Sequence, residues 1–390
     1  MKRVLFVTHS YYLRDTRPRR HAEALSEAGY DVDVLCARDA GEPATEVHRG
    51  VTIHRLPSQR KRGGKARYVF EYVSFIVLAL LAVARMHLRK RYALVWIFSV
   101  PNSVVFAGLV PRLMGVPVVL DVRDPMPEFF ESRFGIGEGS PWIRLLLRDE
   151  KISCRFASHV ATVHETLRET LLRTGVKPER TSVVMNAPDL THLAQAAAWR
   201  EQRDPADRTL LYAGTVAARY GIANAIEAVA RLQEEIPGIR LRIVGDGDHV
   251  RGLIPLARKL RVSDRVQFDG PVPFTEIPGV IASSWAGVQP HRLDPLMAFS
   301  LSTKIIEWCA LGLPVVVSGT PAVREYFDET EVWLIEPGSV DDLCERLRAI
   351  HKEPDAAIAK ANRAREAVLE RFDWSREKDR LLSLVATLAK

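Results

Sequence analysis

The chain has 390 residues, of which 47% are hydrophobic and 26% are charged, a composition typical of a globular protein. Its length exceeds the size at which one core usually keeps growing, so we expect two domains. The net charge of +7 is uneven, because the segment from Arg55 to Arg91 holds ten lysines and arginines and one acid, Glu71, for a net charge of +9. Such a cluster indicates a polyanionic partner, such as a membrane, a nucleic acid or a phosphorylated substrate.

The cysteines and the start of the chain indicate a cytosolic protein. The four cysteines are scattered in apolar stretches without metal-ligand or redox spacing, so we expect reduced thiols that pack in the core. They are Cys36, Cys154, Cys309 and Cys344. The first apolar run, Val4–Val7, is too short for a signal peptide and is predicted to be a buried strand.

In the first half of the chain, short apolar runs alternate with amphipathic stretches. The predicted strands are Val4–Thr8, Val32–Cys36, Val51–Leu56, Leu94–Ser99, Val118–Asp121, His159–Val163 and Thr181–Met185. The predicted helices are Arg19–Glu27, Val104–Met114, Trp142–Ala157 and Thr166–Thr174. This alternation is typical of a parallel sheet with both faces covered by helices.

A second series of the same kind follows a polar stretch, Leu190–Arg208, that lacks strand character. Its predicted strands are Thr209–Ala213, Arg240–Val244, Val266–Phe268, Gly287–Pro290, Val315–Ser318 and Val332–Ile335. Its predicted helices are Ile222–Glu235, His249–Leu260, Glu276–Ser284, Leu301–Leu311, Val340–His351, Ala356–Arg371 and Arg376–Ala389.

These series predict an α/β fold of two doubly wound, Rossmann-like domains that face a central cleft. The expected division is a first domain at 1–189, a connection at 190–208, a second domain at 209–371 and a C-terminal helix at 372–390 that could cross back to the first domain. In such sheets, ligands bind beyond the carboxyl ends of the strands.

The helix Leu301–Leu311 has the clearest chemistry. Gly312 and Pro314 end it, as expected just beyond a helix. Ser302, Thr303 and Lys304 at its start suit an anionic ligand such as a diphosphate, and Glu307 shares a face with Lys304. The alternative is an ordinary amphipathic helix with a Lys–Glu pair at the surface.

Around this helix, short motifs stand in an order that resembles glycosyltransferase family 4 across nearly the whole chain. In the second half they are Leu211-Tyr212-Ala213-Gly214-Thr215, Arg219-Tyr220-Gly221, Arg242-Ile243-Val244-Gly245-Asp246-Gly247, Phe268-Asp269-Gly270-Pro271-Val272-Pro273, Lys304-Ile305-Ile306-Glu307 and Ala310-Leu311-Gly312-Leu313-Pro314-Val315-Val316. In the first half they are Asp15-Thr16-Arg17, Glu23-Ala24-Leu25, Gly29, Asp121-Val122-Arg123-Asp124-Pro125-Met126-Pro127-Glu128 and Val183-Val184-Met185-Asn186.

The resemblance implies a GT-B fold with an acceptor-binding first domain and a second domain that holds a nucleotide-diphosphate sugar. It also implies retention of anomeric configuration without a metal or a cofactor. A leaving diphosphate must then be neutralised by cations and backbone N–H groups, for which Lys304 and Arg219 stand in suitable segments. Glu307 suits a ribose hydroxyl pair. The full set of expected donor residues is Gly214, Thr215, Gly245, Asp246, Val272, Ser302, Thr303, Lys304 and Glu307.

Two of these motifs have an alternative interpretation without a role in ligand binding. Arg219 could be a solvated loop cation, and Gly245-Asp246-Gly247 could be a plain β-turn. This chain also departs from the family pattern, because Phe299 stands where the first acid of a Glu-x7-Glu pair is frequent, and Thr215 and Tyr220 stand where Arg and Lys are frequent. These changes resemble the subgroup with a Ser/Pro-Thr-Lys-x-x-Glu helix start.

In the first domain, Asp124 follows a predicted strand and sits, by resemblance, where many members carry a His or Asp near the donor sugar. Its alternative is a helix N-cap in an Asp-Pro start. The acceptor-side candidates are His9, Asp15, Arg17 and Asn102, of which Asp15 and Arg17 could instead form a salt bridge. No Walker-type loop, zinc spacing or Ser-His-Asp order is found in the sequence.

The basic segment surrounds an apolar stretch, Tyr68–Met86, whose unbroken apolar run is about half the roughly 20 residues needed to span a bilayer. It is either a core helix of the first domain or a helix that lies on an anionic membrane surface, and nucleic acid is the weaker alternative. Arg60, Lys61 and Arg62 on one side and Arg89, Lys90 and Arg91 on the other would contact the lipid.

Together these features predict a cytoplasmic, membrane-peripheral, retaining glycosyltransferase. Its acceptor would be a hydroxyl, such as that of a lipid-linked glycan in surface polysaccharide assembly. A transferase for a small natural product and a GT-B-type sugar-nucleotide epimerase are the alternatives. The sequence does not indicate the base, the sugar, the acceptor, the linkage or the oligomeric state.

Overall fold

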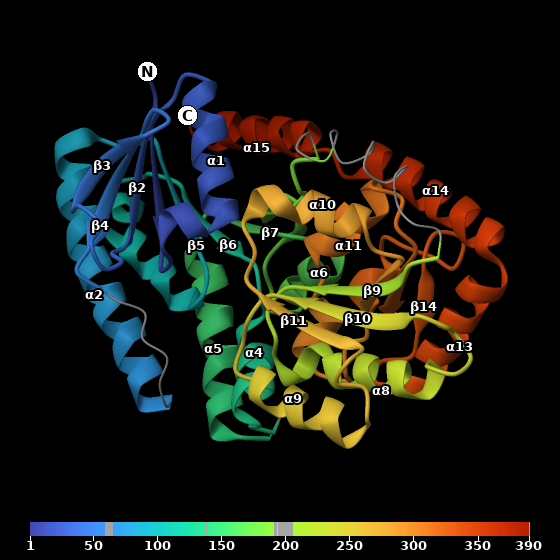
Figure 1. Ribbon diagram of the computed structural model, residues 1–390. Helices are drawn as coiled ribbons and strands as arrows, with labels where there is room; N and C mark the ends of the chain where they lie inside the picture. Colours follow the sequence, from blue (N-terminus) through green and yellow to red (C-terminus); the bar gives the residue numbers. More distant parts are fainter. Residues whose placement is uncertain (59–64, 138, 191–192, 194–205, 390) are drawn as a thin grey trace. The chain divides into compact units, whose positions relative to one another are not determined.

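The structure is a computed structural model that describes residues 1–58, 65–137, 139–190, 193 and 206–389 (Figure 1). It divides into two compact units, one formed by Met1–Asn186 with Ser375–Lys390 and the other by Ala187–Trp374. Each unit is an α/β sheet of mostly parallel strands, which confirms the predicted fold class. Arg60, Lys61, Arg62 and most of the expected connection 190–208 lie outside the described residues.

The first unit is built on an eight-stranded sheet in the order β3-β4-β2-β1-β5-β6-β7-β8. The strands are β1 (Arg3–Thr8), β2 (Asp31–Ala37), β3 (Thr45–His48), β4 (Val51–Leu56), β5 (Leu94–Phe98), β6 (Val118–Val122), β7 (His159–Thr162) and β8 (Thr181–Val183). Every pair is parallel except β3 with β4. The sequence prediction missed β3, because this edge strand has no apolar run and none of its residues is fully buried.

Helices cover this sheet and complete the first unit. The α-helices are α1 (Thr16–Glu27), α2 (Lys65–Lys90), α3 (Leu109–Leu113), α4 (Met126–Phe134), α5 (Pro141–Phe156), α6 (Glu165–Arg173) and α15 (Trp374–Leu388), and the 3₁₀ turns are η1 (Tyr12–Arg14), η2 (Asn102–Gly108) and η3 (Pro178–Arg180). The single helix predicted at Val104–Met114 is split into η2 and α3. At this junction, a Cβ on Gly108 would lie only 2.9 Å from a methyl of Val118, so the turn sits tightly on the sheet.

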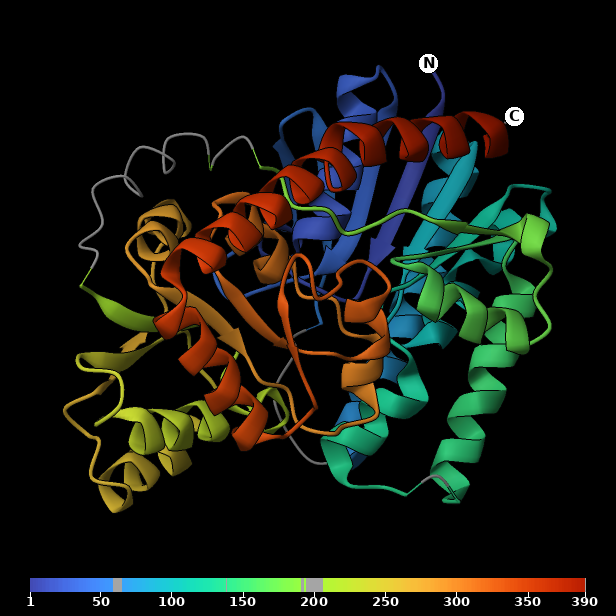
Figure 2. The same ribbon diagram turned by 90° about the vertical axis from the view of Figure 1, so that its right-hand side faces the viewer.

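The C-terminal helix α15 belongs to the first unit, as Figure 2 shows by its course beside the N-terminal strand. Its Glu377 carboxylate accepts a hydrogen bond of 2.7 Å from the backbone N–H of Met185. Lys378 forms an ion pair with Glu27 of α1, and the Lys2 ammonium donates to the carbonyl of Ala389. The predicted return of the last helix to the first domain is therefore confirmed.

Helix α2 is apolar on two opposite faces. Tyr72, Phe75, Ala79 and Val83 on one face are buried in the first unit. The other face exposes Phe70, Val73, Val77, Leu81 and Leu88. The segment Val69–Lys90 of this helix, 22 residues, is long and apolar enough to cross a membrane by length and composition alone. Its most apolar window of 18 residues has a mean hydropathy of 2.0 and is 22% buried.

The second unit is built on a six-stranded parallel sheet in the order β11-β10-β9-β12-β13-β14. The strands are β9 (Arg208–Ala213), β10 (Ile239–Val244), β11 (Val266–Gly270), β12 (Ala286–Gln289), β13 (Val315–Ser318) and β14 (Trp333–Ile335). This is the 3-2-1-4-5-6 order of a doubly wound nucleotide-binding sheet. The order reverses between β9 and β12, which are neighbours at the centre.

Short helices connect these strands. They are η5 (Ala218–Tyr220), α8 (Ile222–Leu232), α9 (Val250–Lys259), η6 (Phe274–Glu276), α10 (Ile277–Ala282), η7 (Leu296–Phe299), α11 (Thr303–Ala310), α12 (Pro321–Arg324), α13 (Val340–Lys352) and α14 (Pro354–Arg371). The predicted helix Leu301–Leu311 is shorter, since it begins at Thr303, but it ends as expected. Gly312 has a φ of +65°, and the N–H groups of Gly312 and Leu313 donate back to Cys309 and Trp308, a Schellman ending.

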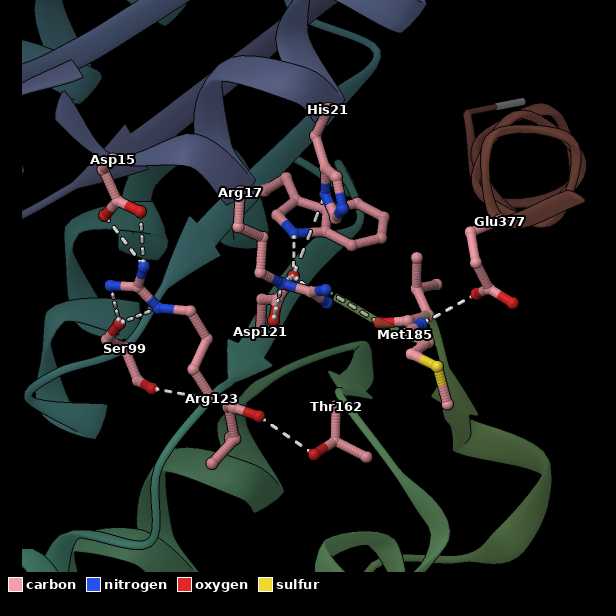
Figure 3. A network of polar contacts seen from close by, with 12 residues as sticks. Asp15, Arg17, His21, Ser99, Asp121, Arg123, Thr162, Met185 and Glu377 are labelled. Atoms are coloured by element: carbon pink, nitrogen blue, oxygen red, sulfur yellow. Dashed lines mark hydrogen bonds and ion pairs between the residues drawn. The ribbon is translucent and has the colours of Figure 1, made fainter. Parts of the chain in front are cut away.

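A buried ion pair joins α1 to the centre of the first sheet (Figure 3). The Arg17 guanidinium donates to the Asp121 carboxylate at 3.0 and 3.2 Å and to the carbonyl of Val184 at 2.8 Å. The indole of Trp96 also donates to Asp121, at 3.0 Å. Both partners are buried, so each charge depends on the other for compensation. The alternative of an Asp15–Arg17 salt bridge is wrong, because Asp15 binds Arg123 instead, at 2.8 Å.

This pair yields a stability prediction. Replacement R17M leaves the Asp121 carboxylate buried without its cation, so we expect the first unit to lose about 3–5 kcal/mol of unfolding free energy. The matched control is R14M, which removes an exposed pair with Asp39 and should cost at most about 1 kcal/mol. Urea unfolding followed by fluorescence and circular dichroism measures both. Equal stability of the two variants would contradict the role of this pair.

Candidate functional site

The candidate site lies in the second unit, where the strand order reverses. Strands β9 and β12 are hydrogen-bonded neighbours whose crossovers lead to opposite edges of the sheet, so the connections that leave their carboxyl ends diverge. Gly214 directly follows β9, and Pro290 and His291 directly follow β12. Ligands of doubly wound sheets bind in this crevice.

Two glycines bring backbone close together at this edge. Gly214 has a φ of +137° and Gly245 a φ of +128°, a region that side chains disfavour. A Cβ on Gly245 would lie 1.9 Å from the carbonyl oxygen of Gly214. The ends of β9 and β10 are therefore in direct backbone contact.

The Lys304 side chain lies over Gly214. A Cβ on Gly214 would be 2.7 Å from Cε and 3.0 Å from Nζ of Lys304. Burial lowers the pKa of the Lys304 ammonium, and the carboxylate of Glu307 opposes this shift. Lys304 is half-buried, so its ammonium lies against the backbone of Gly214 and is less solvated than that of an exposed surface lysine.

The start of α11 adds donors beside this cation. Ser302 is the N-cap residue, but its side chain makes no capping hydrogen bond. The helix begins with Thr303 and Lys304, and both these residues and Ser302 are half-buried. The first N–H groups of a helix have no partner within the helix and carry partial positive charge. Ser302, Thr303 and Lys304 therefore lie together at the start of α11, and their role in holding an anion stays a prediction.

The other donor-side candidates lie in the loops around this edge. Arg219 is in η5, where its guanidinium lies 5.5 Å from the Tyr220 ring centroid and its carbonyl accepts from the N–H of Arg292 at 2.9 Å. Thr215 is exposed, and its carbonyl accepts from the Tyr212 hydroxyl at 2.6 Å. Val272 is half-buried just after β11.

Asp246 sits in a turn that also connects two loops. Its carboxylate accepts from the N–H of Gly247 at 2.7 Å, while its carbonyl accepts from the N–H of Val216 at 3.0 Å. A Cβ on Gly247 would lie 2.0 Å from the carbonyl of Val216. The Gly245-Asp246-Gly247 turn therefore holds the loop after β9 in place. A plain β-turn, the alternative interpretation, would not need these contacts with Val216.

Sequence reasoning missed His291, a buried residue that follows β12. Burial, with the nearby Lys304 charge, lowers the pKa of His291 to about 4, so its imidazole is neutral at pH 7. Its ring lies 5.7 Å from that of Tyr220. The sequence signal that could have indicated this residue is the Pro-His pair directly after a buried strand. The reversal of the strand order at that strand is visible in the structure.

In the first unit, most side chains of the acceptor-side candidates contact other residues of the same unit. His9 is buried after β1, with its ring 4.4 Å from Phe75 and 5.4 Å from Tyr72 of α2. Asp15 forms its pair with Arg123, which also donates to the carbonyl of Ser99 (Figure 3). Arg17 is committed to Asp121.

Asn102 and Asp124 lie at the carboxyl ends of neighbouring strands. The Asn102 amide donates to Glu150 at 3.4 Å, and burial, with the Glu128 charge, raises the pKa of Glu150 to about 7. Asp124 follows β6 and is exposed. It is not the N-cap of α4, because Pro125 takes that position, so the capping alternative is wrong. The sequence prediction had no helix at α4.

Comparisons with known proteins agree with this arrangement. Residues 195–368 match the model of glycosyl transferases group 1, and residues 15–187 match the glycosyl transferase 4-like domain. The chain is a GT-B glycosyltransferase of the family 4 type. The recognised resemblance is thereby confirmed, and the GT-B scaffold explains why two sheets with the same winding occur in one chain.

The curated relatives align with different shares of this chain. The chain is 32% identical over 179 residues to a glycogen synthase of Mycobacterium tuberculosis, which is 46% of this chain and 42% of that protein. It thus spans less than half of that relative. It is 23% identical over 369 residues to the 2-deoxystreptamine glucosyltransferase of Streptomyces kanamyceticus, which covers 90% of this chain and 93% of that enzyme.

Solved structures share the whole fold. Sucrose-phosphate synthase from Thermosynechococcus elongatus aligns over 100% of this chain and 99% of its own, with a TM-score of 0.80 and 19% identity. HepE from Anabaena, solved in complex with UDP-glucose, aligns over 100% of both chains with a TM-score of 0.76 and 16% identity.

The contact between Gly245 and Gly214 yields a prediction for this glycosyltransferase. In G245A the new methyl collides with a backbone carbonyl at an unfavourable φ, so the loops after β9 and β10 must separate. We expect nucleotide binding to weaken by at least tenfold. The control is G252A in α9, where a Cβ makes only an ordinary contact with His249 at 3.7 Å. Isothermal titration with UDP, GDP and dTDP measures both, and unchanged binding in G245A would contradict this arrangement.

Proposed function

We propose that this glycosyltransferase moves a sugar, a hexose or a related one, from a nucleotide-diphosphate donor to a hydroxyl acceptor with retention of anomeric configuration and without a metal. The observation that carries the proposal is the half-buried Lys304 side chain over the Gly214 backbone at the reversal point of the second sheet. HepE, whose fold this chain shares, was solved with UDP and with UDP-glucose, which supports a sugar-nucleotide donor.

The proposed chemistry follows from the charges. When the bond between the anomeric carbon and the diphosphate breaks, negative charge grows on the leaving phosphate oxygen. Lys304, Arg219 and the first N–H groups of α11 would neutralise that charge, while Glu307 would accept hydrogen bonds from the ribose hydroxyls. Within the described residues, no group of three His, Cys, Asp or Glu side chains is arranged to hold a metal ion.

Retention without a protein nucleophile requires attack from the face that the diphosphate leaves. The acceptor oxygen would form its bond to the anomeric carbon as the phosphate departs, and the acceptor proton would pass to the departing phosphate oxygen. Asp124, exposed at the end of β6, would contact the donor sugar or the acceptor. His9, Asp15, Arg17 and Asn102 are proposed to shape the acceptor side of the first unit.

The donor site is tested by nucleotide titration. We expect K304A to weaken the binding of UDP, GDP or dTDP by about tenfold to a hundredfold, because a hydrogen bond to a charged group contributes about 1.5–3 kcal/mol. E307Q should weaken it less. The control K259A removes an exposed lysine at the end of α9. Binding of all three nucleotides to K304A as tightly as to the unmodified protein would contradict the assigned site.

The acceptor is proposed to be lipid-linked, as in cell-surface polysaccharide biosynthesis, because α2 presents an apolar face outward. Its exposed residues Phe70, Val73, Val77 and Leu81 recur at three- and four-residue spacing, and the side chain of Phe70 is 72% exposed. A helix at a protein surface normally turns polar residues to water. An apolar stripe of this length indicates a partner that covers it.

Charge favours an anionic membrane as that partner. Arg85 and Arg89 of α2 are exposed beside the apolar stripe. Helix α5 exposes Trp142, Leu145 and Ile152 together with Arg144, Arg148 and Lys151. Both α2 and α5 pack against η2, so they belong to one helical layer of the first unit. Since the opposite face of α2 is buried in that unit, α2 would lie on the membrane rather than span it, which gives a peripheral enzyme on the cytoplasmic face.

Vesicle sedimentation tests this attachment. We expect the double variant R85Q/R89Q to bind vesicles of phosphatidylglycerol and phosphatidylcholine roughly thirtyfold more weakly at low salt, since each of the two basic residues near an anionic surface contributes about 1 kcal/mol. The matched control R258Q/K259Q removes the same charge from exposed positions of α9. A V77S/L81S variant should also detach. Absence of pelleting for the unmodified protein would remove the membrane from this proposal.

Two other activities remain as alternatives. The Streptomyces kanamyceticus relative, which covers most of this chain, favours a small soluble acceptor as the second candidate. A sugar-nucleotide epimerase would change the donor without any acceptor. Product analysis with donor alone separates the epimerase, because a transferase leaves the configuration of the donor sugar unchanged.

A further inference from the structure

We propose that His291 is a donor-binding residue whose two ring nitrogens bridge a diphosphate oxygen and a hydroxyl of the transferred sugar. The inference rests on the proposed function and adds to it a residue that neither the sequence motifs nor the comparisons assign. It concerns the second unit alone.

The first support is that His291 is buried with no hydrogen bond at either ring nitrogen. Its side chain is 0% exposed, and neither Nδ1 nor Nε2 has a partner among the described residues. Gln289, two residues earlier at the end of β12, is also buried and its Oε1 has no partner within the same described set. Buried polar atoms are nearly always paired, and an unpaired one costs about 1–3 kcal/mol. Two such side chains at a ligand crevice indicate hydrogen bonds that a ligand completes.

The second support is that the backbone of this segment is fixed from both sides. The carbonyl of His291 accepts hydrogen bonds from the N–H of Gly338 at 2.9 Å and from the Ser318 hydroxyl at 3.0 Å. A Cβ on Gly221 would lie 1.7 Å from the carbonyl of Pro290, so the loops after β9 and β12 touch. The His291 backbone is therefore held at the reversal point before any ligand arrives, and its ring lies 5.7 Å from that of Tyr220, which favours a preorganised site.

The third support is the protonation state. Burial and the Lys304 charge keep the pKa of His291 near 4, so at neutral pH the ring has one N–H donor and one bare nitrogen. A diphosphate oxygen can accept from the N–H, and a sugar hydroxyl can donate to the other nitrogen. A sugar nucleotide offers a diphosphate oxygen and a hydroxyl of the attached sugar side by side, whereas the free nucleoside diphosphate lacks the transferred sugar and its hydroxyls.

The test compares each nucleotide with its sugar derivative: UDP with UDP-glucose, GDP with GDP-mannose and dTDP with dTDP-glucose. We expect H291F, which keeps an aromatic ring against Tyr220, to bind the sugar nucleotide at least tenfold more weakly and the free nucleotide only about threefold more weakly. H291Q retains a donor and an acceptor and should restore most of the difference. Calorimetric titration of the full chain gives both affinities.

The possible outcomes separate this inference from the proposed function. If H291F binds both ligands like the unmodified protein, or loses the same factor for both, His291 does not bridge diphosphate and sugar, while K304A still tests the donor site. If none of the nucleotides or sugar nucleotides binds the unmodified protein, the proposed function itself fails. Should H291F melt well below the unmodified protein, H291A takes its place. A loss of sugar-nucleotide affinity in folded H291A that clearly exceeds its loss of nucleotide affinity, and that H291Q largely restores, supports the bridge. An unchanged ratio of the two affinities in H291A overturns it.

Discussion

The contact between the ends of β9 and β10 governs the candidate site. Parallel strands deliver their carboxyl ends to one edge, but a ligand can approach the backbone there only if no side chain intervenes. Gly214 and Gly245 meet this condition, and the space above Gly214 is occupied by the Lys304 side chain. The cation thus sits on the bare backbone, where its charge is little screened by water. The donor chemistry proposed for this glycosyltransferase rests on that arrangement.

A different buried charge organises the first unit. Arg17, from the first turn of α1, reaches Asp121 at the end of β6, while Arg123 binds Asp15 and the carbonyl of Ser99. These arginines tie the loops after β1, β5 and β6 together at one edge of the sheet. Residues that the family pattern marks in this unit are therefore largely structural, and the exposed Asp124 is the exception.

Much of the fold could be predicted because local sequence determined it. The run Val315–Ser318 coincides with strand β13, since a buried parallel strand needs a continuous apolar segment. Val51–Leu56 coincides with β4, whose apolar and polar residues alternate at its start. The sequence prediction missed the edge strand β3, because this strand pairs through its backbone at an exposed edge. It also missed helix α4, because this helix begins after a proline-rich turn. Within the site, the three-residue spacing of Lys304 and Glu307 was enough to predict that they share one face of a helix. The partner of Arg17 could not be predicted, because Asp121 lies 104 residues away, and the importance of His291 depends on burial that one sequence does not reveal.

The place of α15 has a consequence for how the chain acquires its fold during synthesis. The second unit is continuous from Ala187 to Trp374, whereas the first also needs Ser375–Lys390. Until those last residues leave the ribosome, the N–H of Met185 has no Glu377 to bind, and α1 lacks its contact with Lys378. Domains generally fold as units in order of synthesis, but here the unit made first is completed last. The C-terminal helix therefore acts as a late closing step, and its loss would leave the first unit unfinished while the second remains whole.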